Sequence, residues 1–107
     1  MKKHRIEDFT RGWVIGDFEP SLYKTKDFEV SISFVEKGYV GARHIHKLAD
    51  EIHIVTSGKF KLDEDVFVVG DIVYISAGEF SGFECLESGS TTTIKTSSVK
   101  GDKYLVE

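Results

Sequence analysis

The chain has 107 residues and a formal net charge of −4, with 14 basic and 18 acidic residues. This length suits one domain, and the absence of any basic run argues against a nucleic-acid partner. No apolar segment approaches the roughly 18 residues of a membrane span, and the charged N-terminus is not followed by the apolar segment of a signal peptide. The single cysteine, Cys85, has no partner for an internal disulfide. We therefore expect one domain over residues 1–107, in the cytoplasm, with no nucleic-acid or membrane partner.

The composition predicts an all-β fold. Forty residues are β-branched or aromatic, whereas only eight are Ala or Leu. Side chains of the first kind suit a pleated, half-buried surface, and those of the second kind favour helices. Ten glycines and one proline divide the chain into short segments, as turns between strands do.

In chain order, residues 1–25 predict an arm or irregular strand that covers one end of the fold or crosses to a second subunit. Residues 28–34 then alternate apolar and polar side chains without a fault, which predicts a strand with one buried face. The run 66–69 is apolar throughout, so we expect it to be buried on both faces or packed against a partner. Further strands are predicted over 42–47, 51–56, 59–62, 72–75, 83–86, 91–96 and 103–106. Short strands at this spacing indicate a sandwich or a barrel.

Three of the four histidines lie within ten residues. Residues two apart in a strand point to the same face, so His44 and His46 project together, and so do Glu51 and His53. Only four residues separate His46 from Glu51, which predicts a tight connection between neighbouring antiparallel strands. Two imidazoles and a carboxylate that converge in this way suit zinc, iron(II), manganese or nickel. A polar barrel mouth without metal would also account for the spacing alone.

The spacing of glycines around these residues is similar to the first signature motif of the cupins. That motif is a glycine, five residues, His-x-His, four residues, Glu, six residues and a glycine. Its positions here are Gly38, His44, His46, Glu51 and Gly58. The resemblance covers residues 28–86, with 91–107 as C-terminal strands, and implies a double-stranded β-helix, or jelly-roll barrel, of two antiparallel sheets. In cupins, the residues that match His44, His46 and Glu51 are metal ligands.

The second cupin motif departs from the family pattern. Gly70 and Gly78 are present, but the proline between them is Ser76 and the histidine of the fourth ligand is Ser81. A neutral hydroxyl is a poor ligand for zinc or iron(II), so this change weakens the predicted site or leaves an open position. His53 is a candidate replacement ligand or general base. The simpler interpretation makes it a wall residue hydrogen-bonded to Glu51 or to a backbone carbonyl.

Other side chains complete the predicted pocket. Ser81, Tyr74 and His53 are expected to line it, and Tyr39 joins His53 as a candidate catalytic residue. Each tyrosine also suits a packing role. Cys85 is expected to be an inert thiol of the core.

Three functions remain open at this point. The first is a cupin that holds a divalent metal (Fe, Zn, Mn or Ni) and acts on a small polar molecule, with water and substrate at the open positions. The second is a metal-free enzyme, because the stretch from His44 to Lys47 resembles that of sugar-nucleotide keto-isomerases, whose histidines move protons. The third is a cupin that binds a small ligand without catalysis.

A homodimer is a separate expectation. The apolar runs 52–55 and 66–69 offer more apolar surface than the interior of a small barrel needs, and a second copy would bury it. Small cupins are usually dimers, as the resemblance also implies.

Overall fold

A computed structural model describes residues 1–105, apart from the side chains of Phe80 and Ser81. Two short 3-10 helices, η1 (Ile6–Asp8) and η2 (Thr10–Gly12), precede the strands. Eight strands follow within the described residues: β1 (Trp13–Ile15), β2 (Glu29–Val35), β3 (Val40–His46), β4 (Glu51–Leu62), β5 (Asp65–Val68), β6 (Ile72–Ile75), β7 (Phe80–Lys95) and β8 (Lys103–Leu105). Val106, predicted to end the last strand, lies outside these residues. The all-β prediction is confirmed.

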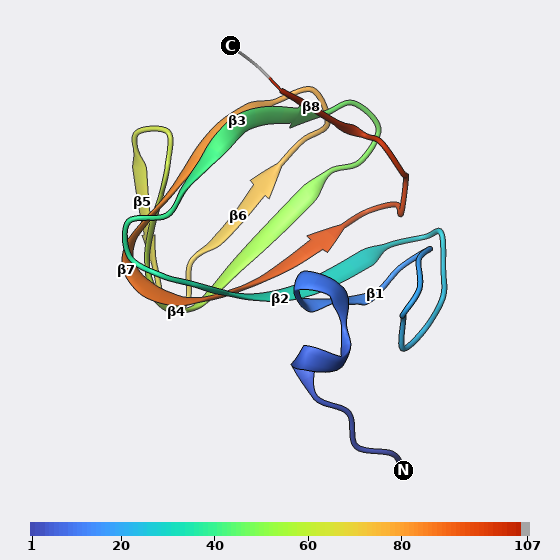
Figure 1. The fold of residues 1–107 in the computed structure, drawn as a ribbon. Coiled ribbons are helices and arrows are strands. Elements are labelled where there is room, and N and C mark those ends of the chain that lie inside the picture. Colours follow the sequence, from blue (N-terminus) through green and yellow to red (C-terminus); the bar gives the residue numbers. More distant parts are fainter. Residues whose placement is uncertain (106–107) are drawn as a thin grey trace.

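Two long strands hold the fold together. β4 and β7 pair with each other in antiparallel register along most of their lengths. One half of this ribbon continues through β6 on one side and through β2 and β1 on the other. The other half continues through β5 and through β3 and β8. The sheet therefore curls until its two halves face each other across an interior, as the double-stranded β-helix prediction requires (Figure 1).

The bend lies where the sequence predicted strand ends. Residues 56–59 of β4 and 87–90 of β7 stay within their strands, but the register between them shifts in this region. Gly58 has a φ of +82°, and a Cβ on Gly89 would lie 2.1 Å from the carbonyl oxygen of Ser57. Two glycines thus let the backbones approach closely while both strands turn a corner. The predicted strand breaks at these positions were wrong, because glycine and serine mark bulges here rather than turns.

The interior has an apolar and a polar end. Val55, Phe60 and Cys85 form the buried core, against which Phe67 and Phe83 pack. Beyond this cluster the buried side chains are polar, namely Ser31, His46, Glu51, Thr91 and Thr93. A small barrel that buries polar groups at one end must satisfy them locally, so this end is where chemistry is to be sought.

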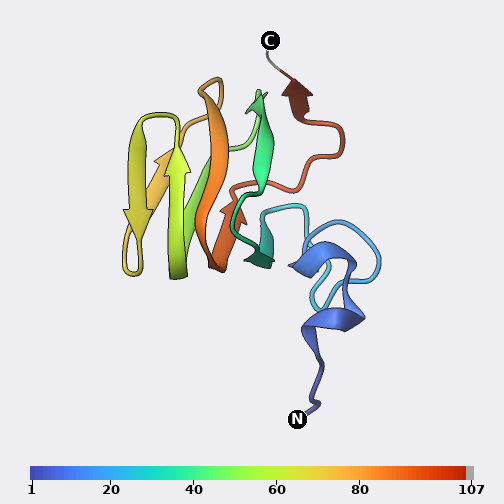
Figure 2. The same ribbon diagram turned by 60° about the vertical axis from the view of Figure 1, so that its left-hand side comes forward.

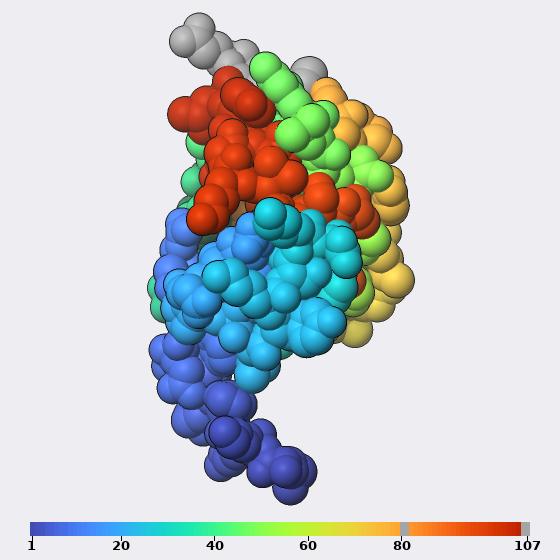
Figure 3. Space-filling model, turned by 90° about the vertical axis from the view of Figure 1, so that its right-hand side faces the viewer, coloured from blue at the N-terminus to red at the C-terminus, as the bar shows by residue number. Residues whose placement is uncertain are grey.

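The segment that leads into β2, light blue in Figure 3, lies beside the red C-terminal segment on one side of the barrel. Ser98 joins the two, because its hydroxyl accepts the N–H of Asp17 at 2.8 Å and donates to Glu29 at 3.0 Å. η1 and η2 extend away from the sheet edge near β2 (Figure 2). The arm therefore covers part of one end of this barrel; its exchange with a second subunit stays a prediction.

The run 66–69 is not buried on both faces within one chain. Phe67 pairs with Phe60 and faces the interior, whereas Val66, Val68 and Val69 are between 43% and 62% exposed. Alternation explains the exposure of Val66 and Val68, since β5 is the outermost strand beyond β4 and its outward side chains meet no further layer. Val69 has the parity of Phe67 but lies beyond the end of β5. No helix among the described residues is long and apolar enough to cross a membrane.

Candidate metal centre

Two strand ends and one loop bring the predicted ligands together. β3 ends at His46 and β4 begins at Glu51, so the residues 47–50 form the tight connection that the spacing predicted. One ligand atom each from His44, His46 and Glu51 lies within 4.8 Å of the others. The rings of His44 and His46 are 5.0 Å apart and nearly perpendicular. The two histidines share a face of β3, as their spacing required.

Asp102 fixes the loop that separates His46 from Glu51. Its side chain is 5% exposed, and its carboxylate accepts the backbone N–H groups of Lys47, Leu48 and Ala49 at 3.0–3.2 Å. The carbonyl of His46 accepts the N–H of Gly78 at 2.7 Å. The sequence predicted no role for Asp102. Nothing in the sequence spacing connects residue 102 with the loop more than fifty positions earlier.

Glu51 is the centre of the hydrogen-bond network. Its carboxylate lies 2.5 Å from His46 Nε2 through Oε2 and 2.7 Å from His53 Nε2 through Oε1. Burial raises the pKa of this carboxyl, but the hydrogen bonds and charges of the two histidines outweigh burial and hold the pKa well below its usual 4.5. Glu51 is therefore ionised and accepts from both rings.

The ionised carboxylate determines where the histidines carry their protons. Because Glu51 only accepts, Nε2 of His46 and Nε2 of His53 are the nitrogens that donate to it. The Nδ1 of His53 then accepts from the hydroxyl of Thr93 at 3.0 Å. The Nδ1 of His46 is buried and has no hydrogen-bond partner among the described residues. A cation bound at this nitrogen would satisfy a buried lone pair that no hydrogen-bond donor reaches.

His44 presents a second lone pair. Its Nδ1 donates to the carbonyl of Ala42 at 2.9 Å, so Nε2 is the unprotonated nitrogen. Burial lowers the pKa of His44, and the nearby charge of Lys103 lowers it further, against a smaller raising effect of the Ala42 carbonyl and Glu51. The ring is thus neutral near pH 7. Two imidazole lone pairs and an ionised carboxylate form a donor set that fits a divalent metal.

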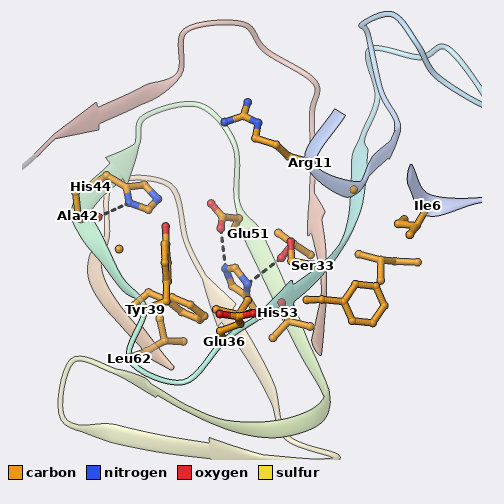
Figure 4. A pocket seen from close by; sticks show the side chains of 18 of the residues that line it. Ile6, Arg11, Ser33, Glu36, Tyr39, Ala42, His44, Glu51, His53 and Leu62 are labelled. Carbon is orange, nitrogen blue, oxygen red and sulfur yellow. Dashed lines mark hydrogen bonds and ion pairs between the residues drawn. The ribbon is translucent and has the colours of Figure 1, made fainter. Parts of the chain in front are cut away.

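His44 and Glu51 border a cavity of about 950 Å³, and His46 lies buried behind them. In the view of Figure 4, Glu51 and His53 lie on its wall between His44 and Ser33, and Arg11 lies above them. A volume of this size accommodates a small organic molecule.

The structure places the remaining predicted residues as follows. His53 lines the cavity and bonds to Glu51, the arrangement of the simpler interpretation. Tyr39 lies at the rim, 55% exposed, with its ring edge against Phe83. Tyr74 does not belong to the lining: it pairs with Ile52 on the outer face of the sheet, and its hydroxyl donates to Asp50. The prediction of Tyr74 as a pocket residue was wrong, because it has the opposite strand parity to Glu51 and His53. Ser81 pairs with His44 in the β3–β7 register, but its side chain lies outside the described part.

The sequence reading missed several lining residues. Thr91 and Thr93 share the inward face of β7, and Ser33 shares the inward face of β2. Their positions in the predicted strands 28–34 and 91–96 could have identified them, because residues two apart in a strand lie on the same face. Arg11 had no such signal, because it lies outside any periodic segment.

Comparisons with known proteins agree on the fold. No family model and no curated protein matches the chain. Among solved structures, an uncharacterized protein with a double-stranded β-helix domain from Klebsiella pneumoniae is similar with a TM-score of 0.76 and 17% identity, over 99% of this chain and 92% of that one.

Two further similar structures carry functional names. The DMSP lyase DddQ from Ruegeria pomeroyi has a TM-score of 0.72 and 15% identity, over 88% of this chain and 49% of the lyase, so this chain spans about half of its length. A sugar phosphate isomerase of the cupin superfamily from Silicibacter pomeroyi has a TM-score of 0.60 and 24% identity, over 70% of this chain and 53% of that one. The chain described here has the double-stranded β-helix fold of the cupins.

Proposed function

We propose that this protein binds one divalent metal through His44, His46 and Glu51 and uses it on a small polar molecule in the adjoining cavity. The observation that carries the proposal is the buried, unpartnered Nδ1 of His46 beside an ionised carboxylate and a second free imidazole lone pair. Iron, zinc, manganese and nickel all accept this donor set. Three ligands leave further positions for water and substrate, as in catalytic rather than structural sites.

When bound, the metal would polarise a substrate oxygen as a Lewis acid. The neighbouring side chains orient the ligands and hold protons. His53 lies beside the ligands and holds a proton on Nε2, which faces Glu51. Thr93 fixes the orientation of that ring from the other side. His53 is therefore placed to orient Glu51 and, when a ligand displaces that contact, to exchange a proton with it. The cupin-fold lyase and isomerase support an assignment to small-molecule chemistry without selecting a reaction.

The second candidate is a metal-free enzyme in which His44 and His46 move protons. The short contact between His46 and Glu51 favours it, since a carboxylate that orients an imidazole is also the arrangement of a general base. The two candidates differ in one respect that can be measured directly, the presence of a metal.

The test is metal content by elemental mass spectrometry, on untagged protein that has met neither chelator nor nickel resin. We expect about one equivalent of metal per chain in the wild type and its loss in the His44→Ala, His46→Ala double variant. His4→Ala is the matched control, because His4 is exposed in the N-terminal arm and lies outside the cavity. If the wild type, after incubation with each of the four metals, holds no more than the double variant, the metal proposal is refuted and the proton-transfer candidate replaces it.

A further inference from the structure

Arg11 is a cationic residue of the cavity that has no partner among the residues the structure describes. It lines the cavity and makes no hydrogen bond or ion pair with any residue that the structure describes. The other two arginines are paired: Arg5 contacts Glu7 at 3.2 Å, and Arg43 contacts Asp63 at 3.8 Å. A guanidinium has five donors in a planar fork and is charged at every relevant pH, so a free one beside a cavity is available to a ligand.

The backbone holds Arg11 in place in an unfavourable conformation. Its φ and ψ are 52° and 32°, the left-handed region that residues other than glycine seldom adopt. The next residue, Gly12, is buried with a φ of +78°, and a Cβ there would lie 2.0 Å from the carbonyl oxygen of Ile32. The arm is thus packed tightly on β2 immediately after Arg11. Strained residues of this kind persist mainly where the side chain's position has a function.

The position of the side chain points to a ligand of the candidate metal centre. Figure 4 shows Arg11 reaching from the N-terminal segment over the cavity, on the side where Glu51 and His44 lie. Neither Glu51 nor His44 forms an ion pair with the Arg11 guanidinium. The Glu51 carboxylate accepts hydrogen bonds from two histidines instead. Of the other cavity carboxylates, Glu7 contacts Arg5, and Glu36 lies on the far side of the cavity in the same view.

Two other cations of the lining balance the two carboxylates, Glu7 and Glu36, that do not belong to the candidate metal centre. Lys37 and Lys103 contribute two further cationic groups to its lining. A metal held by two neutral imidazoles and one carboxylate would keep a net positive charge. An anionic ligand with one group at the metal and another at Arg11 would neutralise both.

We propose that Arg11 binds a carboxylate of the ligand, so that the substrates of this site are small organic acid anions. The inference rests on the proposed function for the cavity's role, but the position of Arg11 on the cavity wall does not depend on the metal. One planar guanidinium matches the two oxygens of one carboxylate. A nucleotide diphosphate would require more than one such group, and a chain with a net charge of −4 offers no extended basic surface for it.

The test is a titration of ¹⁵N-labelled protein with acetate, malonate and succinate, with succinamide as the uncharged counterpart and inorganic phosphate as the competing anion. Chemical shifts of the Gly12 amide and the Arg11 side-chain N–H report the contact. We expect saturable shifts with at least one carboxylate and none with succinamide. Arg11→Gly is expected to weaken that binding by about 10-fold or more. Glycine adopts the left-handed conformation freely, so this variant removes the side chain without adding strain.

Controls separate this inference from the metal proposal. Lys24→Gln removes one positive charge from the same arm, outside the cavity, and is expected to bind carboxylates as the wild type does. Metal content, measured in parallel, is expected to be equal in Arg11→Gly and wild type. The titrations are run on metal-loaded and on chelator-treated protein, and the Arg11-dependent shift is expected in both. Carboxylate binding that is absent from the wild type or unchanged in Arg11→Gly would overturn the inference, and so would tighter binding of phosphate.

Discussion

The Nε2 atom of His53 lies 2.7 Å from the Glu51 carboxylate, two residues earlier on the same strand, and this contact orients the carboxylate toward the other two candidate ligands. We therefore predict that His53 acts as a positioning residue rather than as a fourth ligand. We predict that His53→Gln keeps one equivalent of metal at saturation but weakens its binding by roughly 10- to 100-fold, as removal of such partners does elsewhere. Competition with a chromophoric chelator measures the affinity.

The same measurement on Thr93→Val gives the matched comparison, because this change removes only the hydroxyl that bonds to the far side of the His53 ring. A smaller loss of affinity is expected there. If His53→Gln lost the metal altogether at saturating concentration, His53 would instead be the replacement for the missing fourth ligand.

Asp102 is predicted to stabilise both the fold and the site. Asp102→Ala leaves the amides of Lys47, Leu48 and Ala49 without their buried acceptor. Each hydrogen bond to a charged group contributes roughly 1.5–3 kcal/mol, so we expect a loss of about 3 kcal/mol or more in the free energy of unfolding. Urea denaturation measures it. Asp102→Asn, which keeps one acceptor oxygen, is expected to lose less, and equal losses would contradict the account.

The fold and part of the site were predictable because they follow from alternation. Residues two apart in a strand share a face, and this rule correctly paired His44 with His46 and Glu51 with His53. The gap of four residues between His46 and Glu51 predicted that the two pairs lie close together. Asp102 and Arg11 were not predictable, since the fold brings each to the site from a distant part of the chain and no local pattern encodes that approach. Breaks in β4 and β7 were predicted because glycines usually mark turns. In the structure, Gly58 and Gly89 instead allow the backbones of these two strands to approach closely.

Cys85 is predicted to make stability fall at alkaline pH. Burial raises the pKa of this thiol above its ordinary 9.0, with a smaller opposing effect of the Glu87 backbone. The folded protein then retains the proton where the unfolded chain loses it, so the thiol's contribution is intact below the ordinary pKa of 9.0 and is lost as the pH rises from there through the raised pKa of the folded state. In urea denaturation between pH 8 and 10, Cys85→Ala should show a shallower decline than the wild type. A thiol reagent that labelled native Cys85 at the rate of the unfolded chain would contradict its burial.

A second copy of this chain is predicted to cover the outer face of the β2-β7-β4-β6 half of the sheet. Two cross-strand rows lie there, Val30–Ile94–Ile52–Tyr74 and Ile32–Thr92–Ile54–Ile72, and neither contains a charged residue. Ile72 is 65% exposed, and the face is continuous across four strands. An uncharged face of this extent marks an interface, and a closed pair of identical faces is the commonest way to bury one.

Light scattering should therefore give a molecular mass of twice the 12.0 kDa of one chain. The Ile72→Lys substitution should lower the measured mass toward that of a single chain. Leu48→Lys is the control, since Leu48 is equally exposed but lies in the loop between β3 and β4. A wild-type mass of about 12.0 kDa at all working concentrations would contradict the prediction.

The most direct test of the central claim is a crystal structure of metal-reconstituted protein with anomalous diffraction data collected at the absorption edge of that metal. The account predicts one strong anomalous peak per chain, at about 2.0–2.2 Å from a nitrogen of His44, a nitrogen of His46 and an oxygen of Glu51. Ordered crystals of fully incubated protein with no peak there, or with the metal bound only by other side chains, would contradict it.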